Sequence, residues 1–181
     1  MLEMHLARQR LNQNGFSEPH QKIELIEKAQ QLYQRAAWKG QAGLVWGKMS
    51  GRSRALLSLK TALAGQRLAG RHSGGTQVVP VEQIRGSVHR SHDFDQNFNP
   101  LQVHTEQRWV NLAVAWLAGV TLPPVTLIQV GERYFVEDGH HRLSVARALG
   151  QSFIDAEVTV WEVWPERQAD LAVCWCGATG S

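Results

Sequence analysis

Apolar positions recur at helical spacing near the start of the chain. Ser17 can cap a helix and Pro19 suits its first turn, so we expect a helix over residues 17–39, ended by Gly40. Its apolar side consists of four residues at this spacing: Ile23, Ile26, Leu32 and Tyr33. Over residues 41–70, leucine, valine and tryptophan are mixed with Lys and Arg, which predicts one or two further basic helices.

A change of pattern follows the run Gly-Arg-His-Ser-Gly-Gly at residues 70–75, whose composition is typical of a flexible joint. Beyond it, short apolar runs and strict alternation predict strands as well as helices. The expected elements are, in order, a strand at 78–81, a polar loop to about 100, a helix at 105–118, a hairpin of strands 125–130 and 133–136, a helix ended by Gly150, and a strand at 154–160. The pattern therefore predicts an α/β fold behind a helical extension.

Charge supports a division at the same place. Residues 1–75 carry twelve Lys and Arg against four Asp and Glu, about +8, whereas residues 76–181 carry seven against twelve, about −5. We therefore expect a basic helical extension at 1–75, an acidic α/β domain at 76–164 and a C-terminal tail at 165–181. The overall formal charge of +3 averages two regions of opposite sign.

The chain ends indicate the compartment. No apolar run reaches the roughly 18 residues of a membrane span, and the N-terminus lacks the pattern of a secretory signal, so we expect a cytoplasmic protein without a membrane partner. Cys174 and Cys176 flank Trp175, a spacing that seldom permits a mutual disulfide. A structural role is favoured over a metal or redox role for this pair, because a second Cys/His pair at zinc spacing is absent.

Candidate chemistry gathers first in the long polar loop. Loops of this length in compact domains tend to be functional, and this one carries many groups that bind anions or transfer protons. We select Arg85, Ser87 and Arg90 as residues that close over a ligand, and note Asp93 and Asp95 as further acids.

The second candidate is the turn between the strand at 133–136 and the following helix. A glycine turn at a helix start presents free backbone N–H groups and a partial positive charge, so Gly139 permits close approach of an anion. His140, His141 and Arg142 add donors, with Arg142 the strongest candidate for phosphate. The alternative is a plain helix start with a solvated polar face.

Two acids precede these donors. Glu137 and Asp138 are candidate catalytic residues, which would bind Mg²⁺ beside a polyphosphate or accept a proton from an attacking hydroxyl. The alternative for Asp138 is a cap on the following helix.

The segment Glu-Asp-Gly-His-His-Arg at 137–142, between a strand and a helix, resembles the ParB N-terminal/sulfiredoxin-like superfamily. Supporting likenesses are Val-Pro-Val at 79–81 and Leu-Pro-Pro-Val at 122–125, and the resemblance covers about residues 78–161. It implies a small mixed sheet with packed helices that binds a nucleoside di- or triphosphate, with Mg²⁺ as a companion. The phosphate-contacting role falls on Gly139, His140, His141 and Arg142.

The branches of this superfamily imply different chemistry. Sulfiredoxins carry the reactive cysteine at the place of His140, so the resemblance implies no sulfiredoxin activity here. The free serine kinases have Asp-Gly-His-Thr-Arg, which resembles this segment more closely and implies phosphoryl transfer assisted by Asp138. A ParB-like, DNA-associated nucleotide-binding protein, a small-molecule kinase and a non-catalytic nucleotide sensor therefore all stay open.

The basic region at 1–75 has two interpretations. Its charge would neutralise nucleic-acid phosphates, which makes DNA a candidate partner. Alternatively, it is a helical arm whose leucine and tryptophan positions pack on the acidic domain of its own chain or of a second copy in a homodimer.

Overall fold

The computed structural model describes residues 19–51, 54–90 and 92–165. A long helix, α2 (Pro19–Ser50), is followed by the short strand β1 (Leu57–Ser58) and the short helix α3 (Leu59–Ala62). The remaining elements are β2 (Gln66–Pro80), a 3-10 turn η1 (Val81–Gln83), β3 (Ile84–Ser87), a second turn η2 (Val103–Thr105), α4 (Glu106–Leu117), β4 (Val125–Val130), β5 (Arg133–Asp138), α5 (His140–Ala148) and β6 (Phe153–Pro165).

The strands form one mixed sheet in the order β1-β3-β5-β4-β6-β2. β4 and β5 are the expected antiparallel hairpin, turned at Gly131, and β3 and β6 lie parallel to β5 and β4 at either side of it. This confirms the predicted α/β class, with a small mixed sheet, packed helices and a helix before them.

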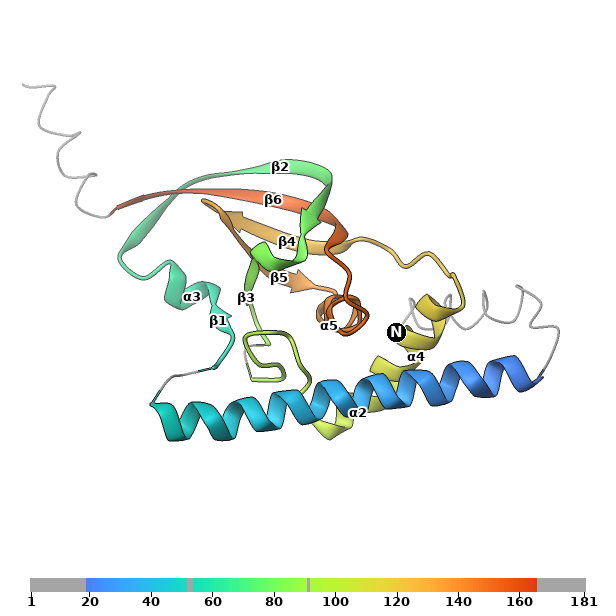
Figure 1. The fold of residues 1–181 in the computed structure, drawn as a ribbon. Coiled ribbons are helices and arrows are strands. Elements are labelled where there is room, and N and C mark those ends of the chain that lie inside the picture. The colour runs from blue at the N-terminus through green and yellow to red at the C-terminus, as the bar shows by residue number, and fades with distance from the viewer. Residues whose placement is uncertain (1–18, 52–53, 91, 166–181) are drawn as a thin grey trace, which may run out of the picture.

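Helices cover one face of the sheet in two layers (Figure 1). α5 lies against the sheet through Leu143 and Ala146, and α4 and α2 pack outside it. Trp109 of α4 is fully buried, as its helical position predicts, and its indole Nε1–H donates to the Ser144 hydroxyl at 2.8 Å. The opposite face of the sheet carries a smaller cluster around Leu59 of α3.

The first helix is longer than the sequence predicts. We expected its end at Gly40, but α2 continues through this position to Ser50. A Cβ atom at Gly40 would lie 3.1 Å from both the Leu101 side chain and the Pro100 carbonyl oxygen. Glycine is used here for the close approach of a loop to the helix, and the prediction that it ends the helix is wrong. The expected cap Ser17 lies outside the described residues.

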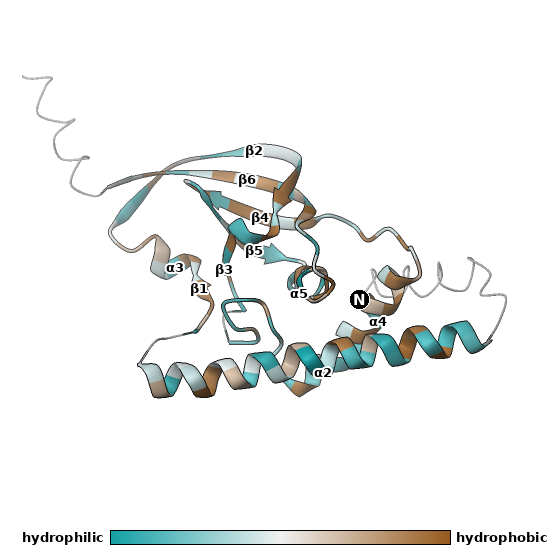
Figure 2. Cartoon of the chain, viewed as in Figure 1, coloured by the Kyte–Doolittle hydropathy of each residue, from teal (hydrophilic) through white to brown (hydrophobic). Residues whose placement is uncertain are grey.

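The expected helices at 41–70 are also corrected. Residues 41–50 belong to α2, and only the four-residue α3 is a separate helix in the described part of this stretch. The apolar side of α2 packs on its own chain through Ala29, Tyr33 and Ala36, in agreement with one alternative for the basic region. Two tryptophans expected at that interface, Trp38 and Trp46, are instead 72% and 64% exposed. Figure 2 shows hydrophobic and hydrophilic residues alternating along α2.

The predicted flexible joint at 70–75 is a strand. These residues belong to β2, which pairs antiparallel with β6 from Gln66 to Pro80. The pairing shifts register between Ser73 and Gly75, and Gly75 has φ +72°, so the glycines form an irregularity of the β-bulge kind within a paired strand. The boundary that we drew after residue 75 therefore falls inside β2, and most of the expected tail at 165–181 lies outside the described residues.

Other predicted boundaries are confirmed within a few residues. α4 begins after Thr105 and gives way to Gly119 at φ +75°, and α5 gives way to Gly150 at φ +72°. Thr105 occupies the N-cap position, but its hydroxyl donates to the Gln102 carbonyl oxygen instead of capping the helix. No helix within the described residues is long and apolar enough to cross a membrane.

Candidate functional site

The candidate site begins at the turn from β5 into α5. Gly139 takes the left-handed conformation, with φ +90° and ψ 21°, and a Cβ atom there would lie 2.7 Å from the Val125 side chain. A larger residue is therefore excluded by both conformation and space. The first backbone N–H groups of α5 have no partner inside the helix, and the nine-residue helix directs its positive end to this turn.

The side chain of Arg142 forms its hydrogen bonds within the protein. One terminal nitrogen donates to the carbonyl oxygens of Pro123 and Pro124 at 2.8 and 2.7 Å, and the other donates to an Asp138 carboxylate oxygen at 2.6 Å. The side chain is 7% exposed, whereas that of Asp138 is 65% exposed. Most donor capacity of this guanidinium is thus engaged in holding the segment before β4 against the start of α5.

His140 is fixed by its surroundings. Its Nε2 lies 2.7 Å from the hydroxyl oxygen of Ser87, which also accepts a hydrogen bond from the Arg90 backbone N–H. Phe94 stacks on the imidazole with the ring centres 6.0 Å apart. Burial lowers the pKa of His140 to about 4, and the positive charge of Arg90 acts in the same direction.

His141 has one nitrogen without a partner. The residue is 7% exposed, and its buried Nδ1 has no hydrogen-bond partner among the residues that the structure describes. Burial lowers the pKa of His141 to about 4, with Arg108 and Arg90 as the next causes. A buried polar atom without a partner is costly, and the side chain of this residue also lines a cavity at the helix start.

A small cavity of about 70 Å³ lies at this helix start, and we call it the anion cavity. Its charged and polar lining consists of Arg90, Arg108, Asp138, His140, His141 and Arg142. Arg108 has no hydrogen bond or ion pair within the described part of the chain, and Arg90 has one long ion pair, 3.6 Å to Asp93. The cavity has room for about two waters or one small anion.

The structure brings only part of the predicted set to this cavity. Gly139, His140, His141, Arg142, Asp138 and Arg90 line it, and the buried Ser87 contacts it through His140. Arg85 and Glu137 are exposed and are absent from its lining.

The two acids of the polar loop have structural partners. Asp95 is fully buried, and its carboxylate accepts hydrogen bonds from the backbone N–H groups of Asn97 and Asn99 and from the Asn99 side chain. Asp93 pairs with Arg90. The loop is ordered around these contacts and contributes two buried rings, Phe94 and Phe98, to the core.

Sequence reasoning missed Arg108 and Phe94. Arg108 lies on the exposed side of α4, next to the buried Trp109, where a cation is an ordinary surface residue. Phe94 lies in a loop that is otherwise mostly polar, where the sequence does not indicate a buried ring. Only the packing of α4 and the loop around α5 places them at the site, so the sequence carried no local signal for either.

Comparison with known proteins adds a likeness to solved structures. No family model matches the chain, and no curated protein matches it. A matching solved structure is a sulfiredoxin from Arabidopsis thaliana, with 20% identity over 54% of this chain and 93% of that chain, at a TM-score of 0.36. Sulfiredoxins are one branch of the superfamily that the 137–142 segment resembles. A likeness of this size carries no conclusion about the chemistry of the site.

Proposed function

We propose that this protein binds a nucleoside di- or triphosphate, with a phosphate group held in the anion cavity. The observation that carries the proposal is the convergence of Arg90, Arg108 and the start of α5 on one cavity. A bound phosphate oxygen would accept from the free N–H groups of the helix start and from the guanidinium groups of Arg90 and Arg108.

Charge around the cavity favours an anion. Arg90 and Arg108 retain free donor capacity, and the carboxylate of Asp138 is already paired with Arg142. Guanidinium groups suit phosphate because their donors are planar and match two oxygens at once. The low pKa of both histidines keeps them neutral at pH 7, so the positive charge available to a ligand comes from the two arginines.

Mg²⁺ fits as a companion of the nucleotide. Within the described residues, no three His, Cys, Asp or Glu side chains gather as ligands for a metal ion. Mg²⁺ is commonly held by one or two carboxylates together with substrate phosphates. Asp138, which is largely exposed at the cavity, is the carboxylate placed to take that part. Kinase activity, DNA binding and a homodimer stay predictions.

The proposal is tested by calorimetric titration of the full chain with ATP, CTP and GTP in the presence of Mg²⁺. We expect at least one nucleotide to bind, and the Arg108→Gln variant to bind it about tenfold more weakly, which is about 1.4 kcal/mol. Arg133→Gln is the matched control, because Arg133 is exposed on β5 and does not line the cavity. Its affinity should equal that of the unchanged protein.

Two results would contradict the proposal. One is the absence of binding for all three nucleotides, with pyrophosphate also inert. The other is binding that Arg108→Gln and Arg133→Gln weaken by the same factor, which would show a general dependence on net charge.

A further inference from the structure

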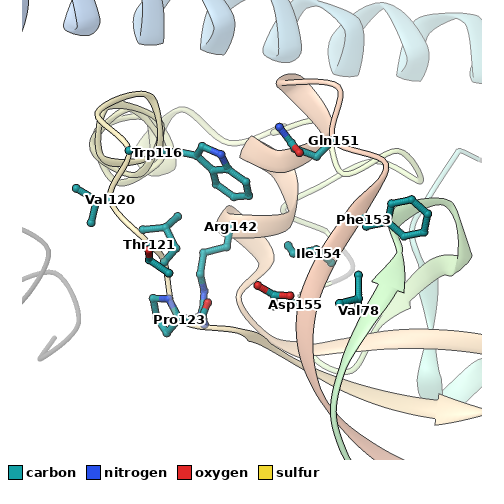
Figure 3. A pocket seen from close by; sticks show the side chains of 12 residues that line it. Val78, Trp116, Val120, Thr121, Pro123, Arg142, Gln151, Phe153, Ile154 and Asp155 are labelled. Atoms are coloured by element: carbon teal, nitrogen blue, oxygen red, sulfur yellow. The ribbon is translucent and has the colours of Figure 1, made fainter.

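A second, larger pocket adjoins the anion cavity. It has a volume of about 370 Å³ and lies where the end of α4 and the 119–123 segment face the start of β6 (Figure 3). We call it the β6 pocket. Ligand pockets in proteins usually measure about 300–1,000 Å³, so this space is sufficient for the ring system of a small organic molecule.

The two spaces share a wall. Leu122, Pro123 and Arg142 line both the β6 pocket and the anion cavity. The hydrogen bonds from Arg142 to Pro123 and Pro124 hold this wall in place. The two spaces are therefore adjacent, and a nucleotide that spans this wall would place its phosphate in the anion cavity and its base in the β6 pocket.

The walls of the β6 pocket suit a flat ring. Trp116, Phe153, Ile154 and Val78 supply apolar and aromatic surface, and Figure 3 shows Trp116 and Phe153 at opposite sides of the pocket. Phe153 is 57% exposed and Val78 is 64% exposed. A ring seated here would remove this apolar surface from water, which stabilises the complex.

Asp155 supplies the one carboxylate in the lining of the pocket, beside two uncharged polar side chains, Thr121 and Gln151. The carboxylate of Asp155, the residue after Ile154 on β6, lines the pocket and has no hydrogen bond or ion pair within the described residues. An ionised carboxylate is an acceptor only, with two oxygens. Guanine presents two adjacent donors on one edge, N1–H and the exocyclic amino group. Adenine and cytosine present one donor beside an acceptor nitrogen, which the second oxygen would repel.

We propose that the β6 pocket holds the guanine base of a nucleotide, with Asp155 accepting from its N1–H and amino groups. This inference rests on the proposed function, because the phosphate of the same nucleotide occupies the anion cavity. It assigns Asp155 as the residue that selects the base, and Trp116 and Phe153 as the apolar surfaces that enclose it.

The test is calorimetric titration with GTP, ITP, ATP, CTP and UTP, each with Mg²⁺. ITP differs from GTP only in the missing amino group. A site built to hydrogen-bond a donor discriminates strongly against an analogue that lacks it, so we expect GTP to bind at least about tenfold more tightly than ITP. The Asp155→Asn variant should bind GTP and ITP with similar affinity.

Glu157→Gln is the matched control. Glu157 is also an exposed acid of β6, but it does not line the pocket, and its substitution removes the same charge. This variant should keep the preference for GTP, and the thermal midpoint of both variants should stay at that of the unchanged protein.

The outcomes separate the two proposals. Equal binding of all five nucleotides, weakened by Arg108→Gln, overturns the assignment of guanine and leaves phosphate binding standing. A preference for GTP that survives Asp155→Asn also overturns the role of Asp155. No binding of any nucleotide overturns both proposals.

Discussion

The anion cavity has two parts that differ in what their cations do. Its floor is the start of α5, where Arg142 is 6% exposed and donates to Pro123, Pro124 and Asp138. Its rim is formed by Arg90 and Arg108, which come from the polar loop and from α4 and are exposed. The floor residues follow one another in the sequence, and the rim residues converge only in the fold.

The two parts therefore have different roles: one holds the site together, and the other is available to bind a ligand. A guanidinium that already donates to three acceptors inside the protein has little capacity left for a ligand. A guanidinium without such partners breaks no hydrogen bond to the protein when it binds an anion. We therefore assign the stability of the site to the floor and its affinity for phosphate to the rim, whereas the sequence alone favours Arg142 as the phosphate-binding residue.

The largest effect that we expect is a loss of stability at low pH, caused by the two histidines of the floor. The pKa of His140 and of His141 is lowered to about 4 in the folded protein, against an ordinary value near 6.5. Between these values the unfolded chain binds more protons than the folded one, so stability falls as the pH falls through this window. The slope is roughly 1.4 kcal/mol per pH unit for each histidine.

Urea denaturation at several values between pH 7 and pH 4.5 measures this slope. His141→Gln should remove about half of the dependence, whereas His20→Gln, at an exposed position of α2, should leave it unchanged. Equal slopes in all three proteins would show that the histidines of the floor are not held neutral by the fold.

Substitution of the buried arginine should have the next largest effect. Arg142→Ala removes the donor to two carbonyl oxygens and to Asp138, and we expect a loss of about 3 kcal/mol in the free energy of unfolding. Arg133→Ala, at an exposed position of β5, is the control and should change it by less than about 0.5 kcal/mol. A similar small change for Arg142→Ala would remove the distinction between floor and rim.

The smallest effect on stability should come from the rim. Arg108→Gln and Arg90→Gln each remove an exposed cation, and in the described residues the only ion pair affected is the 3.6 Å contact from Arg90 to Asp93. We expect the free energy of unfolding to stay within about 0.5 kcal/mol of the original. A loss as large as that of Arg142→Ala, measured by the same urea titration, would show that the rim is structural.

The elements at the floor were predictable because their signals are local. The hairpin of β4 and β5, the glycine turn and the helix α5 are each specified by neighbouring residues, and Gly131, Gly139 and Gly150 all take the positive φ that their turns require. The sequence motif that predicts the floor residues lies within six consecutive residues, 137–142.

The elements that sequence reasoning missed depend on distant partners. β2 is a strand because it pairs with β6, about eighty residues later in the chain, and its glycine-rich composition alone predicts a joint. Gly40 lies within a helix, at a point where Leu101 and Pro100 approach it closely. Arg108 reaches the cavity only because α4 packs on α5. Composition and spacing carry no information about such contacts.

The central claim is that a phosphate group binds in the anion cavity, which His141 lines. The most direct measurement is nitrogen-15 NMR of the histidine side chains of the full chain during titration with pyrophosphate at pH 7. The account predicts a saturable shift of the His141 Nδ1 resonance, which Arg108→Gln moves to higher pyrophosphate concentration. An unchanged Nδ1 resonance at saturating pyrophosphate would contradict it.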